Sequence, residues 1–282
     1  KATKLKTLLS DEAKTIRNRL NQLVSVECHA DDFQELFQKQ KSDFTNQPNL
    51  IFLDQYGVKE VNESVFRSLI SFDKTDFLFF ISSSYLRRFA RENCFRTYFP
   101  DLDPNKLINA KHENIHRVIL EYYRSKIPTE NSTRLYPFSI KKGSNIYGLV
   151  FASKHPLGVE KFLNIVWDKN KLNGEANFDI DGDVEKRQQT LFPELELQKP
   201  TKLEVFKQNF EGFVFNHEEV TNKQLFDFAL ENGHTPRQAR DVLLKLREDG
   251  KVDCDGRIGC SYKTCYKEEN IKTVKAVSSG KL

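Results

Sequence analysis

Two short runs of consecutive apolar residues constrain the fold of this chain more than any other feature. The first covers residues 50–53 and ends at Asp54, and the second covers residues 77–81. Each run has the length of a strand, and the lack of polar alternation is typical of a strand buried on both faces of a parallel sheet. A helical pattern over residues 61–70 separates them. We therefore expect a strand–helix–strand unit and an α/β fold with a mostly parallel sheet.

The rest of the first 181 residues continues this alternation, and we interpret residues 1–181 as one α/β domain. Two segments, 135–141 and 147–153, flank a turn-rich centre and predict a β-hairpin. The spacing of apolar residues predicts helices over 7–23, 31–40, 85–93, 105–126 and 159–170, with a short strand over 24–28.

A change of pattern separates this region from a second domain. Residues 182–200 are charged, lack periodicity and carry Pro193 and Pro200, so we interpret them as a linker. Residues 201–282 form the second domain, with helices expected at 202–210, 221–231 and 235–249 and strands at 251–254, 259–266 and 271–277.

The helix expected from Thr235 has strong signals at its start. Thr235 can cap it, and Pro236 falls at its first position, where the missing N–H costs nothing. Gly233 separates it from the preceding helix, which predicts a helix-turn-helix, and a hairpin around residues 255–256 makes this a winged helix. Its core-facing stripe consists of Ala239, Val242, Leu243 and Leu246.

The opposite side of this helix is basic. It carries Arg237, Arg240 and Lys245, and Arg257 follows in the expected wing. Residues 235–275 contain ten Lys and Arg against seven Asp and Glu, a net charge of +3, which is a modest footprint for phosphate binding. We therefore expect these basic residues to contact nucleic acid. A winged helix that contacts protein, or that is purely structural, stays an alternative.

Cysteine usage argues against both a metal site and a disulfide framework. Cys254, Cys260 and Cys265 lie close together, but structural zinc sites take four ligands and no His is nearby. We expect these three to be buried thiols. The chain has five cysteines, an odd and widely spread set.

The composition gives a prediction for the cellular compartment. No apolar stretch approaches the roughly 18–20 residues that span a membrane, and residues 1–10 lack the apolar core of a secretory signal. The net charge of +4 does not by itself indicate a nucleic-acid partner. We expect a cytoplasmic protein without a membrane partner.

Acidic and aromatic residues follow two of the expected strands. Asp54 and Tyr56 come after the first apolar run, and Asp32 and Phe33 come after the strand expected at 24–28. In doubly wound sheets, ligands bind beyond the carboxyl ends of the strands, so this is a candidate ligand site. A helix cap or a structural loop acid is the alternative for Asp54.

An arginine-rich helix supplies a further candidate. Arg87, Arg88 and Arg91 alternate with aromatic residues such as Tyr85 and Phe89. Arginines with aromatics suit phosphate contact and base stacking, although solvated arginines above buried aromatics give the same pattern.

Four segments, FLDQYG, YLRRFA, YGLVFASKHPLG and GEANFDID, together with the winged helix, resemble the three-Cys-motif partner protein (TcmP) family. The resemblance covers nearly the whole chain and implies a Rossmann-like sheet of the class I S-adenosylmethionine-dependent methyltransferases. In that fold, this chain supplies strands three to five and the antiparallel hairpin of strands six and seven. An N-terminal strand and a Gly-rich turn would precede residue 1, and they are missing from this chain.

The resemblance also implies roles for particular residues. Asp32 and Phe33 would lie beside the adenine of S-adenosylmethionine. Asp54 and Tyr56 would stand at the Asp-Pro-Pro-Tyr position of amino-methyltransferases, where the acid binds the target amine and the ring stacks on the base. Gln55 replaces the Pro that the family has there, which alters how the loop presents its carbonyl.

These observations lead to a main hypothesis and two alternatives. The main hypothesis is a methyltransferase-like protein that acts on nucleic acid together with a radical-enzyme-like three-Cys-motif partner, in bacterial phage-related or mobile-element biology. The first alternative is a catalytically inactive scaffold or nucleic-acid-binding subunit of such a system. The second is a winged-helix regulator whose α/β domain senses a small nucleotide.

Overall fold

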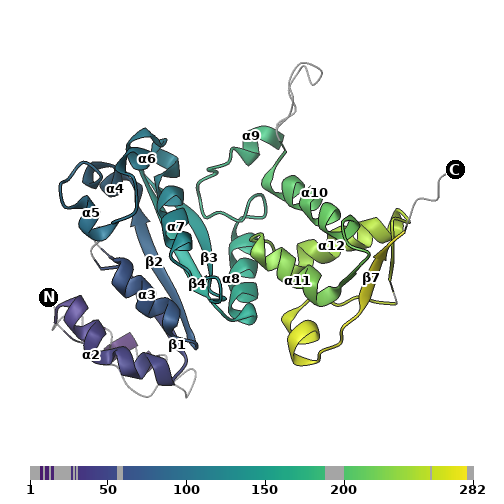
Figure 1. The fold of residues 1–282 in the computed structure, drawn as a ribbon, viewed down its shortest axis with the longest axis horizontal. Helices are drawn as coiled ribbons and strands as arrows, with labels where there is room; N and C mark the ends of the chain where they lie inside the picture. The colour runs from purple at the N-terminus through teal and green to yellow at the C-terminus, as the bar shows by residue number, and fades with distance from the viewer. Residues whose placement is uncertain are drawn as a thin grey trace. The chain divides into compact units, whose positions relative to one another are not determined.

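The computed structural model describes residues 7–8, 10–12, 14–15, 27, 29, 31–55, 60–187, 200–254 and 256–277 (Figure 1). The chain forms two compact units, residues 1–43 and residues 44–282, and each is described by itself. Several predicted features lie outside the described residues: Tyr56, most of the strand expected at 24–28, the linker residues 188–199, and Asp255 at the expected wing turn.

In the first unit, the described residues between 7 and 15 are helical, as the sequence predicts. Helix α2 (Phe33–Asn46) begins in this unit. Asp32 caps it, because its Oδ1 accepts hydrogen bonds from the backbone N–H groups of Gln34 (2.9 Å) and Glu35 (3.3 Å). The rings of Phe33 and Phe37 lie 5.7 Å apart on consecutive turns.

The second unit contains a four-stranded mixed sheet with the order β1-β2-β4-β3. Strands β1 and β2 are parallel, as expected of a strand–helix–strand unit, whereas β4 runs antiparallel to both β2 and β3. The expectation of a mostly parallel sheet is therefore wrong for the described strands, because the hairpin contributes two antiparallel pairings. The predicted hairpin is confirmed: Lys142 pairs with Asn145 across a two-residue turn, and Gly143 has a positive φ of 61° there. The strands are β1 (Asn49–Leu53), β2 (Thr75–Ser82), β3 (Arg134–Lys142) and β4 (Asn145–Ser153).

Helices α3 and α7 cover one face of this sheet. Phe66 of α3 and Tyr123 of α7 pack on each other and on the β2 rings Phe77 and Phe79, with centroid separations of 4.7–6.2 Å. All four side chains are buried, which makes this the core of the sheet domain. The elements on this side are α3 (Glu63–Ser71), α4 (Ser83–Phe89), α5 (Phe95–Tyr98), α6 (Pro104–Asn109), η1 (His112–Asn114) and α7 (Ile115–Ser125).

The single helix expected at 105–126 is wrong. The chain forms α6, the short 3₁₀ turn η1 and then α7. Ala110 and Lys111 adopt extended ψ angles of 147° and 145° between them, so the helical hydrogen-bond ladder is interrupted at these two residues.

Helix α8 (Pro156–Lys169) lies on the other face, over the hairpin. The ring of Phe162 stacks on Phe151 of β4 at 4.2 Å. On the same face of β1, Leu50 and Phe52 are 70% and 56% exposed, so the expectation that this strand is buried on both faces is wrong. The reason is position: α8 packs over β3 and β4, and β1 is separated from β4 by β2.

The C-terminal part of the second unit has the helix and strand order of a winged helix. Three of its helices begin with a reciprocal capping box, in which Thr201, Thr221 and Thr235 pair with the residue three positions on. Its sheet has the order β5-β7-β6, with both neighbours antiparallel to β7. The elements are α9 (Asp183–Arg187), α10 (Lys202–Phe215), β5 (Glu219–Thr221), α11 (Asn222–Glu231), α12 (Pro236–Glu248), β6 (Val252–Cys254), the π-helical turn η2 (Lys263–Lys267) and β7 (Thr273–Ala276).

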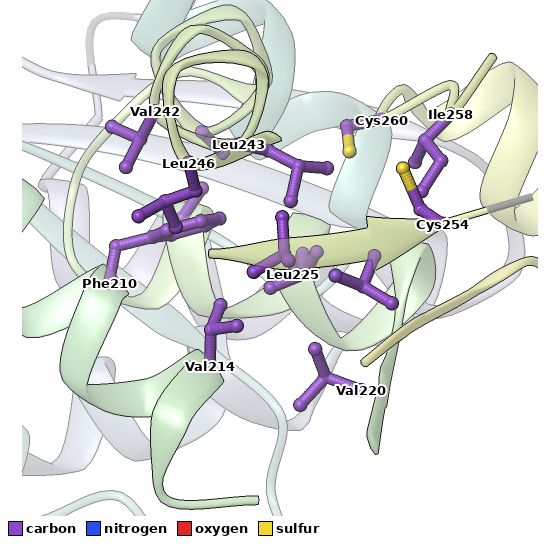
Figure 2. Close-up of a cluster of buried hydrophobic side chains, with 14 of the residues drawn as sticks. Phe210, Val214, Val220, Leu225, Val242, Leu243, Leu246, Cys254, Ile258 and Cys260 are labelled. Carbon is purple, nitrogen blue, oxygen red and sulfur yellow. The ribbon is translucent and has the colours of Figure 1, made fainter. Parts of the chain in front are cut away.

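The core of the winged helix lies between its three long helices and its sheet, as Figure 2 shows. The apolar stripe predicted on α12 is buried there, with Ala239 fully enclosed. Cys254 and Cys260 belong to this core, and Cys265 is also buried, so the prediction of buried thiols is confirmed.

The strand expected at 259–266 is wrong. Residues 257–260 are irregular and η2 follows, so β6 and β7 are not joined by a tight hairpin at 255–256. Tertiary contacts decide the conformation: the Tyr262 backbone N–H donates to Glu160 of α8 (2.9 Å), and the Tyr266 hydroxyl donates to Asp227 of α11 (2.8 Å). The connection therefore folds back onto two helices.

The sheet and the winged helix share a buried apolar cluster within the second unit. Its residues come from β3, β4, α8, α11 and η2, and they are Tyr136, Phe151, Val159, Leu163, Val166, Trp167, Phe226, Leu230 and Cys265. Side-chain hydrogen bonds also cross this boundary, among them one from the Trp167 indole N–H to the Gly233 carbonyl (2.9 Å) and one from the Tyr136 hydroxyl to the Leu230 carbonyl (2.8 Å). No helix in the described part of the chain is long and apolar enough to cross a membrane.

Candidate nucleic-acid interface

Helix α12 has one buried and one exposed side, and a capping box at Thr235 fixes the residue at which the helix begins. The Thr235 backbone N–H donates to the Gln238 amide oxygen (2.8 Å), and the Gln238 N–H donates to the Thr235 hydroxyl (3.2 Å). Because the apolar stripe faces the core, Arg237, Arg240 and Arg247 are left exposed on the outer side.

A groove runs between this exposed side and residues 257–264. It consists of two cavities, of about 530 Å³ and about 360 Å³, that share Arg240, Arg257 and Ile258 in their walls. The larger cavity also has Arg237 in its wall, and the smaller one has Arg247. The structure thus brings together three residues that the sequence predicted for nucleic-acid contact and adds a fourth arginine.

The charge in this groove is strongly one-sided. Among the described residues, Glu160 is the one acidic residue that lines either cavity, and its Oε2 already accepts the Tyr262 N–H. In this part of the chain, four guanidinium groups therefore face a single carboxylate. A concave wall of one sign raises the local concentration of oppositely charged ligands.

Within the described structure, two of the four arginines have no intramolecular partner. Among the described residues, neither the Arg237 nor the Arg257 side chain forms an ion pair or a hydrogen bond, and Arg240 comes no closer than 3.9 Å to Asp241 Oδ1. Arg247 donates from Nη1 to the Gly256 carbonyl (2.9 Å). The unpaired guanidinium groups offer the planar fork of donors that matches a phosphate.

Apolar and small polar groups form the floor. Pro236, Leu243, Leu244 and Ile258 line it, and the hydroxyls of Ser261 and Thr264 lie 3.0 Å apart beside them. No aromatic ring among the described residues lines either cavity, so this part of the chain offers the groove no stacking platform for unpaired bases. Its chemistry suits a phosphodiester backbone.

Lys245, the fourth predicted contact, is placed differently. It does not line the groove, and its Nζ lies 2.9 Å from Asp249 Oδ1 one turn on. This hydrogen bond and charge pair raises the pKa of Lys245 and lowers the pKa of Asp249.

Comparison with known proteins supports the winged-helix fold of this region. Residues 179–259 match the family described as GMT-like wHTH domain. The C-terminal domain is a winged helix. The matched segment extends from just before α9 to Gly259 and contains all four groove arginines. The chain matches no curated protein and no solved structure.

The predicted acid of the α/β domain lies where the sequence places it. Asp54 follows β1 directly and is exposed. The next residue, Gln55, bridges β2 and Val61: its Nε2 donates to the Phe80 carbonyl (2.8 Å), and its Oε1 accepts the Val61 N–H (3.2 Å). A proline at this position could make neither hydrogen bond, so Gln55 differs in its contacts from the residue that the resemblance implies.

The other residues predicted for the methyltransferase site lie in the first unit or outside the described residues. Asp32 caps α2 in the first unit and Phe33 is the first residue of that helix. Tyr56 lies outside the described residues.

The arginine-rich helix has exposed arginines above buried rings. Arg87, Arg88 and Arg91 are exposed on and just after α4, whereas Phe89 and Phe95 are 7% and 1% exposed. The two phenylalanine rings belong to the domain core and cannot stack on a base. Helix α4 also lies at the end of the sheet domain away from α12 (Figure 1).

A buried serine–histidine–serine arrangement is structural rather than catalytic. His116 Nδ1 lies 3.3 Å from Ser83 Oγ, and Nε2 lies 3.0 Å from Ser139 Oγ. All three residues are fully buried, so no substrate can reach them. Burial, assisted by the Arg117 charge, lowers the pKa of His116 to about 4, and the ring is neutral at pH 7.

The buried cysteines are also inert. Burial raises the pKa of Cys260 to about 12, so its thiol stays protonated at pH 7. Within the described ranges, no group of three or more His, Cys, Asp and Glu side chains is placed to hold a metal ion.

Proposed function

We propose that this chain binds nucleic acid through its winged helix, with the phosphate backbone held in the groove between α12 and residues 257–264. The convergence of Arg237, Arg240, Arg247 and Arg257 on one groove, with Glu160 as the single acid among the described lining residues, carries this proposal. An unpaired guanidinium in such a groove binds a phosphate favourably, because it does not have to break an ion pair within the protein first. Nucleic acid is therefore the partner that the charge distribution fits best.

A charge reversal in the groove tests this proposal. Arg240→Glu places a carboxylate where both cavities meet, and we expect it to weaken binding of a labelled duplex by at least tenfold in a fluorescence-anisotropy titration. Lys245→Glu is the matched control, because it makes the same charge change on the same helix outside the groove. Equal effects of the two variants would contradict the proposal.

The α/β domain adds a finer proposal, that the protein is methyltransferase-like and acts on the bound nucleic acid with a three-Cys-motif partner. The parallel pair β1–β2, followed by the antiparallel hairpin, supports it, as does Asp54 at the carboxyl end of β1. S-adenosylmethionine would supply the methyl group, with Asp32 and Phe33 beside its adenine. A calorimetric titration with S-adenosylmethionine tests this, with Asp32→Ala as the variant that should lose binding.

The alternative is a catalytically inactive scaffold that keeps the nucleic-acid groove. The Gln55 bridge favours it, because an amide side chain bonded to Phe80 and Val61 stands where amino-methyltransferases have a proline. No S-adenosylmethionine binding by a chain that binds nucleic acid normally would select this alternative. The link to phage-related biology belongs to the same proposal and rests on the resemblance.

A further inference from the structure

The groove is not built by the winged helix alone. Its larger cavity is also lined by Glu160 and Asn164, which lie one turn apart on α8 of the sheet domain. Asn164 is exposed, and its side chain makes no hydrogen bond within the described part of the chain. An amide facing unpaired arginines is a further donor for a phosphate oxygen.

The wall formed by α8 cannot swing away from the groove without breaking buried contacts. Trp167, two residues before the end of α8, donates to the Gly233 carbonyl in the turn that precedes α12. Glu160 accepts the Tyr262 N–H on the opposite wall. The shared apolar cluster lies behind these two hydrogen bonds. Helix α8 and the winged helix therefore move together as one body, because separating them would expose the apolar cluster to water.

Helix α8 carries both signs of charge beside Asn164, since Glu160 and Asp168 lie one turn to either side of it and Lys161 is also a neighbour. Lys161 is exposed three residues before Asn164, and within the described structure it has no ion-pair partner. A nucleic-acid strand that runs from the groove arginines over Asn164 would reach the Lys161 ammonium group next, since residues three apart are neighbours on a helix surface.

We infer that the nucleic-acid site is shared between the two domains, and that α8 of the sheet domain binds the same phosphodiester chain as α12. This inference rests on the proposed nucleic-acid function. It goes beyond that function because it assigns binding residues outside the winged helix. It also gives the sheet domain a fixed position relative to the bound strand.

Charge substitutions at two adjacent positions of α8 test the inference. Asn164→Glu puts a carboxylate into the groove wall, and we expect a loss of duplex affinity of about tenfold by fluorescence anisotropy. Ile165→Glu is the matched control: the side chain is 67% exposed and does not line the groove, so we expect a change of less than about twofold. Asn164→Lys should strengthen binding, and a misfolded variant cannot produce that gain.

The outcomes separate this inference from the proposal on which it rests. If Arg240→Glu weakens binding while Asn164→Glu and Ile165→Glu behave alike, α8 is not part of the site and the inference is wrong. If the full chain binds neither duplex nor single strand, or if Arg240→Glu has no effect, the proposed function fails and the inference fails with it. Weaker binding by Asn164→Glu and tighter binding by Asn164→Lys would together establish the shared site.

Discussion

At the residue scale, His234 is the titratable group on which the junction of the two domains depends. Its ring lies between Phe206 of α10 (4.0 Å, nearly parallel) and Trp167 of α8 (4.9 Å). Burial, with a smaller effect from the Lys202 charge, lowers its pKa to about 3. The ring is therefore held neutral between two aromatic faces, where an added proton would be poorly solvated.

The direction of the pH dependence follows from this lowered pKa. The unfolded state takes up the proton near pH 6.5 and the folded state only near pH 3, so the stabilisation is complete above pH 6.5 and declines as the pH falls toward 3. We expect His234→Phe, which keeps an aromatic ring in the stack, to remove about 2–3 kcal/mol of the stability loss between pH 7 and pH 4.5.

Urea unfolding at the two pH values measures this difference. His217→Phe is the control, since His217 is exposed just beyond the end of α10. A His234→Phe variant that loses as much stability on acidification as the natural chain would show that the stacked ring does not govern the pH response.

At the element scale, two glycines in regular structure should respond in opposite directions to the same substitution. A Cβ at Gly148 of β4 would lie 2.7 Å from His116 Cδ2, inside a fully buried contact, whereas a Cβ at Gly212 of α10 would meet nothing within 4 Å. We expect Gly148→Ala to destabilise the fold by about 1–3 kcal/mol through overpacking. Gly212→Ala should stabilise it by about 0.5–1 kcal/mol through helix propensity.

Thermal and urea unfolding of the two variants give the comparison directly. Both substitutions add the same single methyl group, so a difference in sign reports the local environment rather than composition. Two destabilised variants of similar magnitude would contradict the packing described around α10.

The sequence was informative about elements whose signals are local. The cap at Thr235, the proline at the first position of α12 and the apolar stripe all lie within one segment, and the helix begins and ends close to where they place it. The turn η2 could not be predicted in this way. The β-prone residues around it favour a strand, whereas Tyr262, Cys265 and Tyr266 are spaced i, i+3 and i+4 as on a helix. Their contacts with α8 and α11 decide the conformation.

The candidate site was predicted in part for the same reason. Arg237, Arg240 and Arg257 were identified from charge on a predicted helix and wing. Arg247 was missed, although its spacing of seven from Arg240 places both on one helix face. Asn164 could not be found, because only the folded chain brings α8 beside α12.

At the scale of the whole second unit, the winged helix is part of a continuous structure with the sheet domain. The shared cluster and the hydrogen bonds from Trp167 and Tyr136 join the two regions directly. Two domains joined only by a flexible linker would have water between them instead. A nucleic acid bound at α12 is thereby held at a fixed place relative to β3, β4 and α8. This arrangement suits either reading of the α/β domain, since a methyltransferase and a scaffold both require a positioned strand.

The most direct test of the central claim is the salt dependence of duplex binding by the full chain. The groove presents four arginines, of which Arg237, Arg240 and Arg257 have no strong internal ion pair within the described residues. Three neutralised phosphates give a slope of about −3 in a plot of log K against log salt concentration. We expect a slope near that value, and close to −2 for Arg240→Glu. A slope near zero, or one that Arg240→Glu leaves unchanged, would show that phosphate contacts in this groove do not hold nucleic acid.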